Sequence, residues 1–188
     1  MASVSSVSIA NRALQRLGAT RITSLAQDHK NARSCNVAYD PVRRALLRNY
    51  AWSFAVKRFS VAADATLTTW GTLNRYQVPN DFLGLLRPTD ARVDWSIEGQ
   101  FIVTSDDSPL QGRYVFDATD PATFDALFVE AFACKLAYEI CEDVTGATTK
   151  RQFLAQDLKQ IVNEARQANS FELDPVVPVE DDFILAMR

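Results

Sequence analysis

The residues that could support acid–base or nucleophilic chemistry are few in this 188-residue sequence. Its single histidine, His29, stands at the expected start of a helix among polar neighbours. A histidine acting as a general base needs a nucleophile or a reacting proton within hydrogen-bond reach, and the sequence has no nucleophilic serine of the elbow type. We therefore interpret His29 as a solvated surface residue.

The cysteines do not indicate a metal site. Cys35 lies six residues from His29, off the spacing of three or four that places two ligands on one helical face. Cys134 and Cys141 are seven residues apart in one expected helix, about 10 Å at 1.5 Å per residue, which exceeds the reach of a disulfide. We predict three buried, reduced thiols and no cofactor. The isolated glycines also exclude a phosphate-cradling loop.

Three carboxylates form the remaining chemical candidate. Glu139, Glu142 and Asp143 share one expected helix, and a pair of carboxylates is the catalytic requirement of glycoside hydrolysis. Acids near the end of a helix are more commonly solvated. A cell-wall hydrolase using Glu139 and Glu142 therefore remains an alternative function.

Basic residues dominate one segment although the chain is acidic overall, with a formal net charge of −3. That net charge argues against a protein that holds nucleic acid by bulk charge. The segment from Arg33 to Arg58 contains one acid, Asp40. We predict that four of its arginines form a solvated or intersubunit face or a DNA-facing strip, which leaves a DNA-binding assembly factor as a second alternative. These residues are Arg43, Arg44, Arg48 and Arg58.

The elements that position these residues follow from the hydrophobic periodicity. Apolar residues recur at helical spacing in residues 7–17, 28–48, 126–141 and 149–168, whereas turn signals crowd residues 59–116. We predict an α+β, mainly α fold: a bundle of about four helices, an inserted small antiparallel β region and an extended C-terminal arm. The expected parts are residues 1–58, 59–117, 118–171 and 172–188.

Local signals predict where the helices begin, end and bend. Ser5 or Ser6 caps the first helix and Gly18 ends it. Pro41 predicts either a kink or two helices meeting at Tyr39–Asp40. Two later N-termini are expected, at Thr119–Pro121 and, as a capping box, at Thr149–Gln152.

Two further segments are rich in apolar residues. Residues 126–141 form a helix that must be covered on most sides, and its three charges exclude a membrane span. Residues 93–97 and 100–104 form a hairpin around Glu98–Gly99, carrying Trp95 and Phe101, with Gly112–Phe116 as another strand of the same sheet.

The last segment, Glu172–Arg188, combines two prolines and five acids with an apolar end, Phe183–Met187. It cannot fold alone. Two interpretations stay open: an end that frays or packs back on its own domain, and an arm that becomes ordered on another subunit.

Short motifs spread through nearly the whole chain resemble one family. In order, they are Ala13–Leu14, Leu17–Gly18, Ile22–Leu25 with Asp28, Cys35–Asn36, Tyr39–Asp40, Val42–Arg43, Leu46–Leu47, Trp52–Ala55 with Lys57–Arg58, Tyr76 with Pro79 and Asp81, Asp120–Pro121 with Phe124, Leu127–Phe128, Glu130–Ala131 and Leu136–Ala137. Their order and spacing resemble the phage tail tubular protein A family, the head-to-tail adaptors of short-tailed phages. Tyr50–Ala51 departs from the family, which usually has His-Pro there.

The resemblance implies a non-enzymatic structural protein of the virion. Its copies would form a ring, usually dodecameric in that family, between the portal and the tail nozzle or tube, through which genomic DNA passes. From this we expect the arm to bind the portal through Phe183, Ile184, Leu185 and Arg188. We expect the hairpin with Trp95 and Phe101 to face the nozzle, and we expect no membrane contact.

Overall fold

The computed structural model of the chain describes residues 4–65, 73–88 and 94–172. These residues form four α-helices and two small antiparallel sheets, so the fold is α+β and mainly α, as predicted. The elements are α1 (Ser6–Leu17), α2 (Lys30–Arg48), β1 (Val56–Val61), β2 (Asn74–Gln77), β3 (Phe82–Pro88), β4 (Trp95–Glu98), β5 (Phe101–Thr104), β6 (Leu110–Phe116), α3 (Ala126–Thr145) and α4 (Thr148–Ser170).

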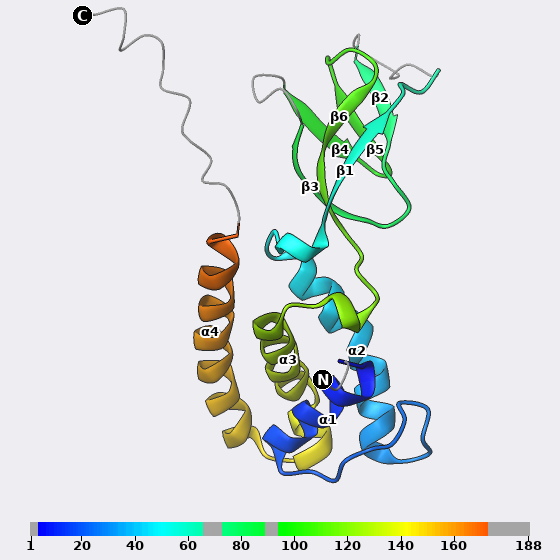
Figure 1. Cartoon of the computed structure of the whole chain (residues 1–188). Coiled ribbons are helices and arrows are strands. Elements are labelled where there is room, and N and C mark those ends of the chain that lie inside the picture. The colour runs from blue at the N-terminus through cyan, green and yellow to red at the C-terminus, as the bar shows by residue number, and fades with distance from the viewer. Residues whose placement is uncertain (1–3, 66–72, 89–93, 173–188) are drawn as a thin grey trace, which may run out of the picture.

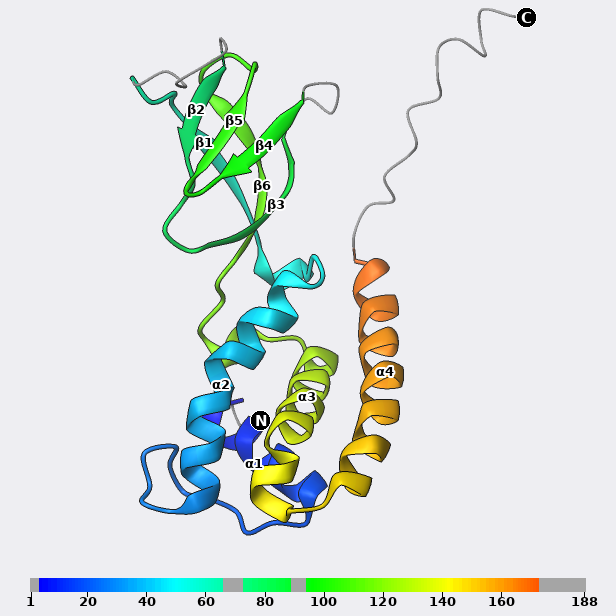
Figure 2. The same cartoon turned by 180° about the vertical axis from the view of Figure 1, so that it is seen from behind.

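The four helices form a helical body with α3 at its centre. In both views α3 lies between α2 and α4, and the strands lie beyond one end of the body (Figures 1 and 2). Phe128, Phe132 and Leu136 of α3 are fully buried, because α1, α2 and α4 all contact this helix. The prediction that this helix is covered on most sides is confirmed.

Local capping sets the first two helices. Ser5 and Ser8 form a reciprocal capping box at the start of α1, and Gly18 ends it with φ at 66°. Helix α2 is one continuous helix with Pro41 inside it, so the alternative of two separate helices is wrong. Pro41 and Val37, whose carbonyl loses its helical donor, are both exposed, so solvent can hydrate that carbonyl.

Of the two later helix starts, the one at Asp120–Pro121 is confirmed and the one at Thr149–Gln152 is not. Asp120 caps a short 3-10 helix at Pro121–Thr123, and Asp125 caps α3 with bonds to two backbone amides. Helix α4 starts after Ala147 without a side-chain cap. The predicted box at Thr149–Gln152 is wrong because Thr149 already lies within the first turn of α4.

The strands, residues 56–116, form the β head of the molecule. Strands β1-β6-β3 make sheet A and strands β2-β5-β4 make sheet B. Tyr76 and Ile102 of sheet B pack with Leu110 of sheet A in a small second core. The prediction that β6 extends the hairpin sheet is wrong, because β6 pairs with β1 and β3 as the central strand of sheet A.

Two boundaries in and beside the β head shift from their predicted places. The hairpin is confirmed, but its turn is Gly99–Gln100, because Glu98 pairs with Phe101 and Gly99 takes the positive φ of 63°. Strand β1 begins at Val56 rather than near residue 59. The arm beyond Glu172 lies outside the described residues.

Candidate functional site

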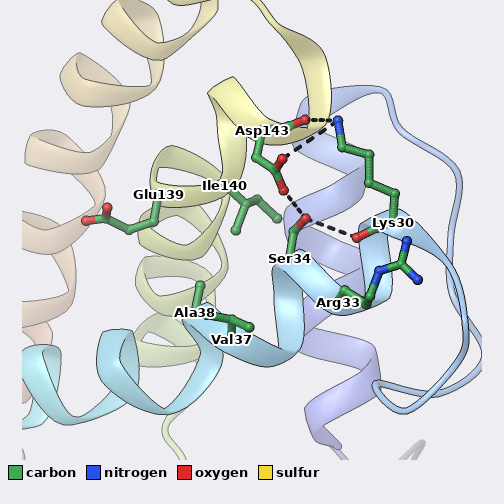
Figure 3. Close-up of a pocket in the computed structure, with 8 residues that line it drawn as sticks. All are labelled: Lys30, Arg33, Ser34, Val37, Ala38, Glu139, Ile140 and Asp143. Carbon is green, nitrogen blue, oxygen red and sulfur yellow. Dashed lines mark hydrogen bonds and ion pairs between the residues drawn. The ribbon is translucent and has the colours of Figure 1, made fainter.

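An open groove lies between α2 and α3. It has a volume of about 430 Å³, and its lining residues are Lys30, Arg33, Ser34, Val37, Ala38, Glu139, Ile140 and Asp143 (Figure 3). Ala38 and Ile140 supply apolar surface, and Val37 is 76% exposed. The sequence analysis did not single out Val37.

The polar end of the groove fastens α2 to α3. Asp143 accepts a hydrogen bond from the Ser34 hydroxyl, and its carboxylate lies 3.7 Å from Lys30 Nζ. Lys30 also donates to the backbone carbonyl of Asp143 near the end of α3, where the helix dipole favours a cation. Ser34 has no histidine partner among these lining residues. The contacts of this cluster hold α2 and α3 together.

Each of the three candidate carboxylates has a basic partner of its own. Glu139 accepts from Lys135 at 2.5 Å, Glu142 accepts from Arg151 at 2.9 Å, and the Asp143 carboxylate lies 3.7 Å from Lys30 Nζ. Figure 3 shows Glu139 pointing away from Asp143. A glycosidase needs two carboxyls facing a common bond, whereas these three carboxylates each face a different base.

His29 is exposed, as predicted, and also caps α2. Its Nδ1 accepts a hydrogen bond of 3.2 Å from the backbone amide of Asn31. The cysteines are free and buried, and burial raises the pKa of the Cys35 thiol to about 11. Within the described residues no group of histidine, cysteine and acidic side chains could hold a metal ion.

Arg43 is not part of an exposed strip. Its side chain is 4% exposed, and its guanidinium bonds Asp117 at 2.6 Å and the Ala118 carbonyl at 2.6 Å. The prediction that Arg43 lies on the surface is therefore wrong. Asp117, 74 positions further along the chain, forms the ion pair that holds the arginine side chain in the interior. Arg44 lies beside it, 58% exposed, with Asp117 at 3.4 Å.

Arg48 and Arg58 lie apart from that pair. Arg48, at the end of α2, donates to the Leu83 carbonyl of β3. Arg58 lies on β1 of sheet A, directly opposite Arg113 of β6. The predicted arginine strip thus divides into a buried junction and residues at the base and the outer face of the β head.

The predicted hairpin pair divides between two environments. Trp95 and Ile97, two residues apart on strand β4 at the edge of sheet B, are 41% and 40% exposed. Alternate residues of a strand share one face, so these two side chains form a small apolar surface. Phe101 is only partly exposed, because the guanidinium of Arg75 lies 4.0 Å from its ring centre.

The predicted arm residues, Phe183, Ile184, Leu185 and Arg188, lie outside the described residues. The structure does describe the end of α4, from which the chain continues into the arm. Buried Asn169 of α4 bonds the Ser53 amide and the Ala51 carbonyl, at 2.8 Å and 3.1 Å. Glu172 accepts from the Ser53 hydroxyl at 2.5 Å, so the end of α4 is fastened beside the start of β1.

The outer face of α4 carries an exposed aromatic residue that the sequence analysis did not single out. Phe153 is 64% exposed. Asp157 and Glu164 follow it at four and eleven residues, close to whole numbers of helical turns, and both are exposed. The signal that could have identified Phe153 is its position: it is an apolar residue on the polar face of an amphipathic helix.

Comparison with known proteins adds no support to the family resemblance, which rests on the sequence motifs alone. No family model matches the sequence, and no curated protein matches it either. Among the helices of the described residues, none is both long enough and apolar enough for a membrane crossing.

Proposed function

We propose that this chain is a structural head-to-tail adaptor, one subunit of a ring between the portal and the tail nozzle of a short-tailed phage. The order of motifs that resembles the tail tubular protein A family is the starting point. The observation that carries the proposal further is a pair of unlike surfaces on the helical body, the α2–α3 groove with exposed Val37 and the α4 face with exposed Phe153.

These two surfaces suit a head-to-tail contact between copies. The groove is lined by Lys30 and Arg33, each paired with an acid of its own copy, and by Glu139 and Asp143, whereas Phe153 is followed by Asp157 and Glu164 on its own helix face. In our proposal Phe153 of one copy fills the groove of the next, with the acids facing the bases. A contact between two different patches repeats from copy to copy, and it closes into a ring when the rotation between neighbouring copies divides a full turn.

The other ends of the molecule supply contacts above and below the ring. Trp95 and Ile97 on the edge strand of the β head would meet the nozzle, and Phe183–Leu185 of the arm would meet the portal. Each copy carries a formal charge of −3, so a ring of copies repels passing DNA rather than holding it.

A charge exchange tests the proposed contact between copies. Lys30→Glu with Arg33→Glu, or Asp157→Lys with Glu164→Lys, should each abolish the ring-sized complex that forms with portal, measured by sedimentation. Combining the four substitutions should restore it. The exposed pair Arg21→Glu and Lys159→Glu is the control for charge change alone. A ring that survives either reversal would contradict this contact.

A further inference from the structure

The outer face of sheet A carries two like charges side by side. In the register of β1 and β6, Arg58 pairs with Arg113. Residues directly opposite each other in neighbouring antiparallel strands share a face, with Cβ atoms about 5 Å apart, and like charges there are destabilising. We call these two positions the arginine row.

A third arginine reaches the same face from α2. Gly84 pairs with Val115, two residues from Arg113 along β6, and so lies on the same face one step nearer the body. A Cβ on Gly84 would lie 3.3 Å from Arg48 Nη1. The guanidinium of Arg48 therefore lies over the glycine, which leaves room for it beside the row.

The described carboxylates near this face are already engaged. Asp117 pairs with Arg43 and Arg44, and Asp81 pairs with Lys57 and Tyr114. Lys57 is adjacent to Arg58 in β1, so Asp81 and its partners belong to the opposite face of the sheet. Arg58 and Arg113 are exposed and form no ion pair or side-chain hydrogen bond with the described residues.

The anion that suits the row is in the chain itself. Residues 173–188 contain four acids and one base, so they carry a formal charge of −3, equal to that of the whole chain. Three of the acids are consecutive, Glu180–Asp182. In an extended chain Glu180 and Asp182 would lie on the same side, about 7 Å apart, a spacing that lets two carboxylates meet the neighbouring guanidinium groups of Arg58 and Arg113.

The arm starts close enough to reach the row. Glu172 is fastened to Ser53, and Arg58 lies five residues further along the chain from Ser53, at most about 17 Å away. Glu180 lies eight residues beyond Glu172, a reach of about 26 Å in extended chain. A tether this short holds the two charged groups at an effective concentration of about millimolar.

We infer that, in the free chain, the acidic segment Glu180–Asp182 docks in cis on the arginine row of sheet A. The docked segment neutralises the row and holds the apolar end of the arm against its own β head. This property of the unassembled chain goes beyond the adaptor function and holds whether or not that function is correct.

The test is paramagnetic relaxation in the full-length chain. Ile184→Cys carries a nitroxide selectively, since the three native cysteines are buried. Amide signals of residues 56–60 and 111–115 should lose intensity, and the loss should disappear at about 0.5 M NaCl, where exposed charges are screened within a few ångströms. Arg58→Glu with Arg113→Glu should also abolish it, whereas Arg21→Glu with Lys159→Glu should not.

A charge exchange and two competing results complete the test. Adding Glu180→Arg, Asp181→Arg and Asp182→Arg to the double row variant should restore the intensity loss. Loss that persists in the row variant alone would overturn the proposal. The proposal would also be overturned if the amide signals lost intensity only when spin-labelled chain is mixed with chain that lacks the spin label. That result would assign the segment to a second copy. Duplex DNA that binds the row equally well with and without residues 173–188 would assign it to nucleic acid instead.

Discussion

Arg43 of α2 and Asp117, the residue after β6, form a 2.6 Å ion pair in which the arginine side chain is 4% exposed. The same guanidinium donates to the Ala118 carbonyl at 2.6 Å. These bonds join the helical body to the chain that returns from the β head. A buried arginine with its hydrogen bonds satisfied fixes a junction, because separating the parts would leave charges unpaired.

Removing this arginine should destabilise the fold. We expect Arg43→Ala to lower the free energy of unfolding by about 3–5 kcal/mol, since it leaves the Ala118 carbonyl without its donor and Asp117 with only the more distant Arg44. Arg44→Ala is the matched control, 58% exposed on the same acid, and should cost below about 1 kcal/mol. Urea denaturation measures both, and equal losses would contradict the assignment of Arg43 to the junction.

Acid should weaken the contact between α1 and α3. Burial of Glu130 opposes its ionisation, but hydrogen bonds and charges from Arg12 and Arg16 outweigh it and hold the pKa of this carboxyl below its ordinary value. A lowered pKa in the folded state gives stability that is present above the ordinary pKa and is lost as pH falls through the folded pKa.

The measurement is the urea midpoint of wild type and Glu130→Gln at pH 7 and at about pH 3, below the ordinary carboxyl pKa. The wild type should be the more stable at pH 7, and the difference should shrink at the lower pH. Glu164→Gln, an exposed acid on α4, should show no such change. A Glu130→Gln difference that is the same at both pH values would refute the pairing.

The centre of α3 should tolerate truncation poorly. Phe132 is fully buried and its ring lies 4.8 Å from that of Tyr39, so Phe132→Ala should cost about 3–5 kcal/mol in a denaturant melt. Phe153→Ala removes the same atoms from a side chain that is 64% exposed and should cost below about 1 kcal/mol. A cost below about 1 kcal/mol at Phe132 would show that α3 is not the core helix.

Features that depend on near neighbours in the chain could be predicted from the sequence. The spacing of apolar residues located all four helices, and Ser5 and Gly18 bound the first one because a cap is a contact between residues a few positions apart. The hairpin was predicted for the same reason, with an error of one residue in its turn.

Features that depend on distant residues could not be predicted. The placement of β6 in sheet A depends on pairing with β1 and β3, which no local pattern encodes. Arg43 resembled its exposed neighbours until Asp117, 74 positions away, was seen to meet it. The bond from Lys30 to Asp143 spans 113 positions. The arginine row likewise exists only through the strand register.

The most direct test of the adaptor proposal is electron microscopy of the protein mixed with the portal of its own phage, with the protein alone as control. We expect a second ring stacked on the portal ring, with the helical bodies side by side and α4 of each copy in the groove of the next. Portal rings that stay bare while the 21.0 kDa chain remains free would contradict the proposal.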